Sequence, residues 1–158
     1  MITTLRKAPD CAFGVVDDLF ICLWRESQPT LESAEKCGEL VKQHQQTRQG
    51  PIGLVTIVPE NSPTPDGAVR KRIADVLSAS TNVKGSAVCF EGTGLRATIV
   101  RTIVTGITLM ARLSFPHQVF ASALAGTAFV VACLRDARVE SRDARDLSAE
   151  IDAWRKSL

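Results

Sequence analysis

Aromatic side chains are scarce in this sequence, which contains no tyrosine, two tryptophans and six phenylalanines. Proteins that bind single-stranded nucleic acid stack the bases on aromatic side chains, and this chain offers little material for such a platform. An excess of one charge is also missing, because 19 basic and 17 acidic residues leave a net charge of +2. Both features argue against nucleic acid as a partner.

Cysteine pairs of the Cys-x-x-Cys type are absent as well. The five cysteines are scattered among apolar residues, at Cys11, Cys22, Cys37, Cys89 and Cys133. Zinc knuckles and redox-active dithiols need the paired spacing, so the sequence predicts no metal site and no catalytic residue of this kind. The N-terminal residues lack the apolar run of a signal peptide. We therefore expect unpaired, buried thiols in a reducing cytoplasm.

The most apolar segment of the sequence also lacks a long uncharged run. The most apolar stretch, TGLRATIVRTIVTGITLMARLSFP at 93–116, is interrupted by three arginines, and its longest uncharged run, 102–111, has 10 residues. A membrane span needs about 20 mostly apolar residues, so we predict no span here. The expected structure is a buried central helix over about 94–113. Its predicted apolar stripe consists of Leu95, Ile99, Ile103, Ile107 and Met110.

Strands and helices alternate along the chain. Two apolar runs on either side of Asp17-Asp18 predict a β-hairpin, and Thr30 is the predicted N-cap of the first helix. Further strands are predicted at 52–58, 86–90 and 117–121, and further helices at 68–80, 94–113 and from Ser122 to about 134. The order ββαβαβαβα plus a C-terminal helix predicts one α/β domain. Its five-stranded sheet is expected to be mostly parallel or mixed, with helices on both faces.

This alternation resembles the STAS fold, the small domain of sulfate transporters and anti-sigma-factor antagonists, and its bacterial relatives grouped with lipid-binding CRAL-TRIO domains. The resemblance rests on the hairpin FGVVDDLFICLWR, the helix after PTLESAEK, the strand GLVTIV and the pair AVCFEG and VFASALAGTAF, and it covers residues 11–135. It implies a bacterial, cytoplasmic, non-enzymatic module for protein interaction or regulation. We expect this domain to occupy 1–135, and a charged connector and amphipathic helix to occupy 136–158.

One motif of the STAS antagonists is missing. They carry Asp-Ser-Ser/Thr-Gly-Leu, with a phosphorylatable Ser or Thr, after the third strand, where this chain has PENSPTPDG with only Ser62 and Thr64. A partial match, EGTGL at 91–95, occurs one strand–helix unit later. A phosphorylation switch therefore does not follow from the resemblance.

The turn GTGLRA at 92–97 fits the relaxed dinucleotide pattern Gly-x-Gly-x-x-Gly/Ala between a strand and a helix. No Asp or Glu occurs from Gly92 to Arg135, so no acid is available to hold a ribose. We interpret the segment as a tight turn and expect no cofactor. An anion site at the helix N-terminus is the alternative. Its candidate residues are Thr93, Gly94, Arg96 and His117.

The C-terminal segment carries a narrow apolar stripe beyond its charged connector, formed by Leu147, Ile151, Trp154 and Leu158. Asp146 or Ser148 is the predicted cap of this helix. Such a helix buries its stripe on its own domain, on a second copy or on another protein. We predict that residues 146–158 form a helix whose stripe is buried against protein, in its own domain or in a second copy. The four side chains are also the candidates for contact with a protein partner.

Three functions are compatible with these patterns, and each predicts a different structure. The interaction module requires a closed core with an exposed Trp154 stripe. A carrier of a small amphiphile or lipid requires an apolar cavity beside helix 94–113. An enzyme acting on a phosphorylated substrate at the Gly92–Arg96 turn requires that Arg96 and His117 meet in one pocket. The sequence favours the first, non-enzymatic function.

Overall fold

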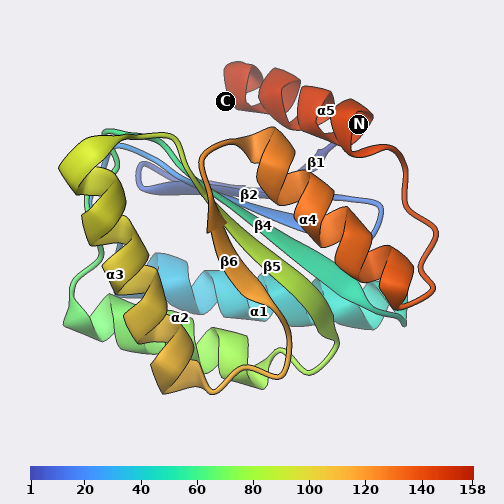
Figure 1. Ribbon diagram of the computed structural model, residues 1–158, viewed down its shortest axis with the longest axis horizontal. Helices are drawn as coiled ribbons and strands as arrows, with labels where there is room; N and C mark the ends of the chain where they lie inside the picture. The colour runs from blue at the N-terminus through green and yellow to red at the C-terminus, as the bar shows by residue number, and fades with distance from the viewer.

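A computed structural model describes residues 1–158 and shows a six-stranded mixed sheet between two layers of helices (Figure 1). The strands are β1 (Thr3–Lys7), β2 (Cys11–Val16), β3 (Leu19–Trp24), β4 (Ile52–Val58), β5 (Val83–Phe90) and β6 (His117–Phe120). The helices are α1 (Leu31–Arg48), α2 (Gly67–Ala79), α3 (Gly94–Ala111), α4 (Ala123–Asp136) and α5 (Ala144–Ser157). The predicted α/β class is confirmed, whereas the prediction of five strands is wrong.

The strand that sequence reasoning missed is β1. Its sequence, TTLRK, has no apolar run, and most of its side chains are exposed. It forms through backbone pairing with β2, and the register shifts between Thr4 and Arg6. Polar, charged and irregular strands are typical of sheet edges, where they hinder pairing with other chains.

The strands lie side by side in the order in which they occur in the sequence. β1, β2 and β3 are antiparallel neighbours, and β3 to β6 are parallel. Because parallel crossovers are right-handed and the order never reverses, α1, α2 and α3 all lie on one face of the sheet (Figure 1). The sheet therefore has no topological switch point, the usual ligand position in open α/β sheets.

Alternating strand residues fill two separate cores. Ile21 and Val55 point to the face covered by α4 and α5. Phe20 and Leu54 point to the opposite face, which α1, α2 and α3 cover. Both faces of the central strands are buried, which explains their nearly continuous apolar sequences.

Local polar signals set most of the predicted helix starts. Thr30 caps α1 by accepting a hydrogen bond from the Ser33 N–H, and Ser122 caps α4 in the same way. The predicted cap of α5 is wrong. Asp143 accepts the hydrogen bond, from the Arg145 N–H, so the helix begins before Asp146. Asp143 satisfies one free N–H group of the first turn and lies four residues before Leu147, the first residue of the apolar stripe, so the stripe alone did not indicate it.

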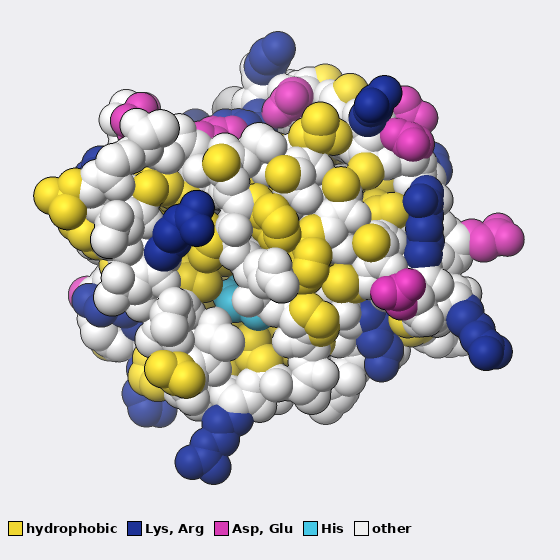
Figure 2. Space-filling model, viewed as in Figure 1, with side chains coloured by type: hydrophobic (Ala, Val, Ile, Leu, Met, Phe, Trp, Pro, Cys, Tyr) yellow, Lys and Arg dark blue, Asp and Glu magenta, His cyan; other side chains and the backbone are white.

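The expectation of a buried central helix over about 94–113 is also wrong. Val100, Val104, Ile107 and Ala111 are buried, whereas Leu95, Ile99 and Met110 of the predicted stripe are exposed. α3 lies beside the edge strand β6, so only one of its sides meets the sheet. Figure 2 shows hydrophobic side chains at the surface over both ends of α3. Its length and mean hydropathy of 1.2 would allow it to cross a membrane, a weak indication that core helices of soluble proteins also give.

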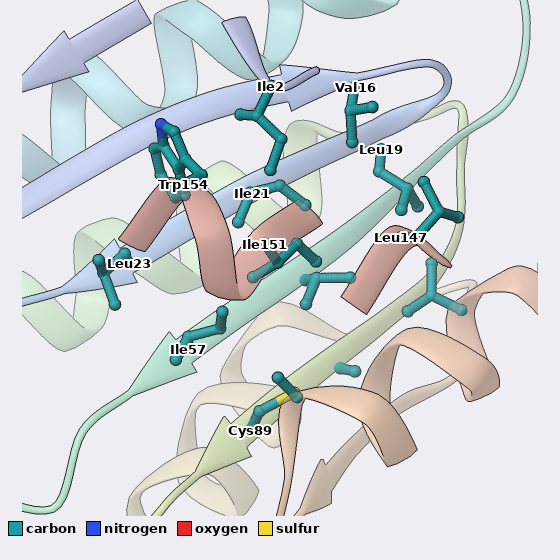
Figure 3. Packing of buried hydrophobic residues seen from close by; sticks show 14 of the residues in the cluster. Ile2, Val16, Leu19, Ile21, Leu23, Ile57, Cys89, Leu147, Ile151 and Trp154 are labelled. Atoms are coloured by element: carbon teal, nitrogen blue, oxygen red, sulfur yellow. The ribbon is translucent and has the colours of Figure 1, made fainter. Parts of the chain in front are cut away.

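α5 docks on the domain and covers the strands at the antiparallel end of the sheet. Leu147, Ile151 and Trp154 lie in the same core as the residues of β2, β3 and β4 (Figure 3). The Trp154 Nε1–H donates a hydrogen bond to the Thr4 hydroxyl at 2.9 Å. Arg155 donates two hydrogen bonds to the Glu91 carboxylate, at 2.6 and 2.7 Å. The C-terminal helix is therefore an integral part of the fold in one chain.

Candidate functional site

A cavity of about 120 Å³ lies between the sheet and the layer formed by α1, α2 and α3. Its walls are mostly hydrophobic and come from β3, β4, β5 and all three helices. An engineered cavity of about 150 Å³ stays dry and binds benzene, so the volume here suits one small ring or a short alkyl group.

Short side chains in the middle of long strands make room for this cavity. Thr56 in β4 and Ser86 in β5 line it between the apolar residues of their strands. The inner side of α3 supplies the opposite wall through Val100, Ile103 and Ile107. Sequence reasoning missed Thr56 and Ser86, because a hydroxyl residue inside a strand does not by itself indicate a cavity.

A polar group lies inside this apolar space. His117 is the first residue of β6 and pairs in register with Ser86 of β5, and both line the cavity. The Nδ1 atom of His117 is buried and has no hydrogen-bond partner. Burial lowers the pKa of His117 to about 4, because the charged imidazolium loses its hydration. At neutral pH the imidazole is uncharged and can both donate and accept a hydrogen bond.

The cavity wall contains no Lys, Arg, Asp or Glu. An ionised group placed inside would lose its hydration without gaining a counter-ion, which is strongly unfavourable. In a neutral molecule with one hydrogen-bonding group, the apolar part would instead contact the walls, and the polar group would lie near His117. The cavity therefore discriminates by charge as well as by size.

The loop between β4 and α2 closes the cavity at the carboxyl ends of β3 and β4. Ser62 and Thr64 of this loop line the cavity. The Ser62 hydroxyl donates a hydrogen bond to the Arg25 carbonyl at 2.9 Å, and Gln28 donates one to the Thr64 carbonyl at 2.9 Å. Arg96 of α3 donates another, to the Ser62 carbonyl at 2.8 Å. These bonds tie the loop to two neighbouring segments.

The candidate anion-site residues do not meet in one place. Thr93 precedes α3 without a side-chain cap hydrogen bond, and Gly94 has a φ of 63°, which glycine adopts without strain. The Arg96 guanidinium bonds the Ser62 carbonyl and does not line the cavity that contains His117. The structure therefore brings His117 together with Ser86 and Thr56, not with Arg96.

The interaction candidates of the C-terminal stripe lie within the chain itself. Leu147, Ile151 and Trp154 are buried, and Leu158 packs against the same core. Binding of a partner through these side chains would require α5 to leave the domain.

The structure contains neither a cluster of metal-ligating side chains nor a disulfide. No group of three or more His, Cys, Asp or Glu side chains lies close enough to hold a metal ion. All five cysteines are free. Burial raises the pKa of the Cys89 thiol to about 12, so it stays protonated and is a poor nucleophile.

Comparison with known proteins gives no further guide to function. No protein-family model, curated protein or solved structure matches this chain. The resemblance to STAS domains therefore stays a hypothesis.

Proposed function

We propose that this protein is a binding or carrier domain for a small, neutral and mostly apolar molecule. The observation that carries the proposal is the buried, unpartnered Nδ1 of His117 in an otherwise apolar cavity. A buried polar group without a partner costs about 1–3 kcal/mol, and a ligand with one hydrogen-bonding group would remove that cost.

The size of the cavity sets the expected affinity. Burying about 150 Å² of apolar ligand surface at about 25 cal/mol per Å² gives about 4 kcal/mol, which corresponds to a Kd near 1 mM. A hydrogen bond to His117 adds about 1 kcal/mol. Single-ring probes should therefore bind weakly but measurably.

Phenol and toluene are a matched pair for testing this proposal. Both fit one ring into the cavity, and only phenol carries a hydroxyl for His117. In an NMR titration of backbone amides we expect phenol to bind about fivefold more tightly than toluene, because one net hydrogen bond is worth about 1 kcal/mol. The shifted amides should belong to β4, β5 and α3.

Two variants locate the binding. His117→Phe should abolish the preference for phenol while leaving toluene binding in place. Ser86→Leu should weaken both probes by filling the cavity, whereas Ser114→Leu, at an exposed position, should change neither. The proposal is wrong if neither probe shifts amides around the cavity, or if Ser86→Leu leaves both affinities unchanged.

The interaction-module and enzyme hypotheses have less support. The first needs an exposed Trp154 stripe, and Trp154 is only 6% exposed within its own domain. The second needs Arg96 and His117 in one pocket, and only His117 lines the cavity.

A further inference from the structure

The outer side of α3 is apolar and uncovered. Leu95 is 76% exposed, Leu109 73%, Met110 53% and Ile99 43%. At 100° per residue these four side chains fall on one side of the helix, opposite the buried Val100, Val104, Ile107 and Ala111. The four side chains lie near the two ends of the helix, and Thr102 and Gly106 lie between them on the same side. We call these four residues the apolar stripe of α3, and exposed apolar residues gathered on one side of a helix are typical of an interaction surface.

The threonine hydroxyl groups of α3 form hydrogen bonds within the helix and do not need water as a partner. Thr98, Thr102, Thr105 and Thr108 each donate a side-chain hydrogen bond to the carbonyl four residues earlier, at 2.8–3.4 Å. Their hydroxyls are thus satisfied within the helix, as serine and threonine hydroxyls commonly are in a lipid environment. The helix could leave water on this side without leaving hydroxyl groups unpaired.

The charge around this stripe is positive. Arg101 and Arg112 are exposed, and neither forms an ion pair, whereas the segment from Gly92 to Arg135 contains no acid. Glu91 is held by Arg155, and Asp75 on the neighbouring helix α2 is paired with Lys71. Glu60 approaches Gly92 at the N-terminal end of α3, beyond the stripe.

A second copy of the chain is a poor match for this surface. Face-to-face packing of two α3 helices would bring their arginines together, and α3 has no acidic side chain to neutralise them. An anionic bilayer offers what the surface needs: an acyl boundary for the apolar stripe and phosphates for the arginines.

We propose that α3 docks this protein on anionic membranes, lying in the plane of the interface with Leu95, Ile99, Leu109 and Met110 in the acyl boundary. Ile103 and Ile107 on the inner side of the same helix line the cavity, so docking would place the cavity one helix away from the lipid. The docking surface itself does not depend on a cavity ligand.

Vesicle flotation of the intact chain tests the proposal, with phosphatidylcholine vesicles compared with vesicles that also contain phosphatidylserine. We expect association with the mixed vesicles and much less with phosphatidylcholine alone. Leu95→Ser combined with Leu109→Ser should lower the partition coefficient at least about a hundredfold, because each buried leucine contributes more than about 1.4 kcal/mol, or about tenfold. Arg101→Gln and Arg112→Gln should each lower it about fivefold and reduce its salt dependence.

Leu31→Ser is the matched control, because Leu31 is also a leucine, 45% exposed, at the start of α1. It should leave vesicle binding unchanged. The proposal is overturned if the wild-type chain ignores the mixed vesicles, or if Leu31→Ser lowers binding as much as the double variant. A dimer that dissociates in the double variant, without any vesicle binding, would also overturn it and assign α3 to a protein interface. Phenol binding by the double variant reports separately on the cavity.

Discussion

Protonation of the His117 imidazole, which lines the cavity, should change the stability of the whole chain. Its pKa of about 4 in the folded protein lies below the ordinary value of 6.5. Above pH 6.5 the His117 side chain is neutral in both the folded and the unfolded chain, and its contribution to the free energy of unfolding is then at its maximum. As the pH falls from 6.5 towards 4, only the unfolded chain takes up the proton, so the free energy of unfolding should fall by up to about 3 kcal/mol.

Urea unfolding across this pH range measures the effect. His117→Phe should flatten the decline. His44 contributes in the same direction, because burial lowers the pKa of His44 as well. His44→Phe should therefore remove a separate share of the slope. A slope that survives intact in the His117→Phe variant would show that the pKa of this side chain is the same in the folded and the unfolded chain.

Gly14 and Gly106 should respond in opposite ways to the same substitution. A Cβ atom at Gly14 would lie 2.7 Å from Ile2 and 3.0 Å from Trp154, whereas at Gly106 it would meet nothing within 4 Å. We expect Gly14→Ala to lower the free energy of unfolding by about 1–3 kcal/mol through overpacking. Gly106→Ala, in the middle of α3, should raise it by up to about 1 kcal/mol. Denaturant unfolding of both variants checks this, and equal effects would contradict the packing of α5 on β2.

Only part of the cavity lining could be predicted from the sequence. The sequence indicates His117 as a candidate for anion binding, yet at neutral pH it lies uncharged in an apolar cavity. Thr56 and Ser86 could not be found, because their importance comes from the helices packed above them. A cavity is a property of tertiary packing, and no local pattern reports it.

Helices and strands were predictable where their signal is local. Thr30 and Ser122 were recognised as caps because a hydroxyl before an apolar-periodic segment has a direct backbone role. β1 was missed because a polar edge strand forms through pairing alone. The periodicity of α3 was recognised, but the helix has two apolar sides, and the spacing does not tell which of them meets the sheet.

α5 provides a prediction at the level of a single element. Trp154→Ala should lower the free energy of unfolding by about 3–5 kcal/mol, because it removes a large buried ring and the bond to Thr4. Trp154→Phe keeps most of the packing and should cost about 1–2 kcal/mol. The molecular mass in light scattering should stay the same in both variants. A mass that falls towards one chain in Trp154→Ala would instead place the helix in a dimer interface.

At the scale of the whole molecule, the sequential strand order separates the two faces of the sheet by function. The α4–α5 face is a filled core that includes the C-terminal helix. The opposite face, built by the three crossover helices, contains the cavity and the exposed helix α3. Binding and membrane docking are thus proposed on one face, while the other holds the domain together.

The contact between Trp154 and Thr4 joins residues 150 positions apart, and this has a consequence for biosynthesis. On the ribosome, β1, β2 and β3 emerge well before α5, and the apolar face that α5 will cover stays open until α5 has been made. During that interval the nascent hairpin presents Ile21 and its neighbours to chaperones or to other nascent chains. Translation of α5 is therefore the event that ends the exposure of this apolar face to aggregation.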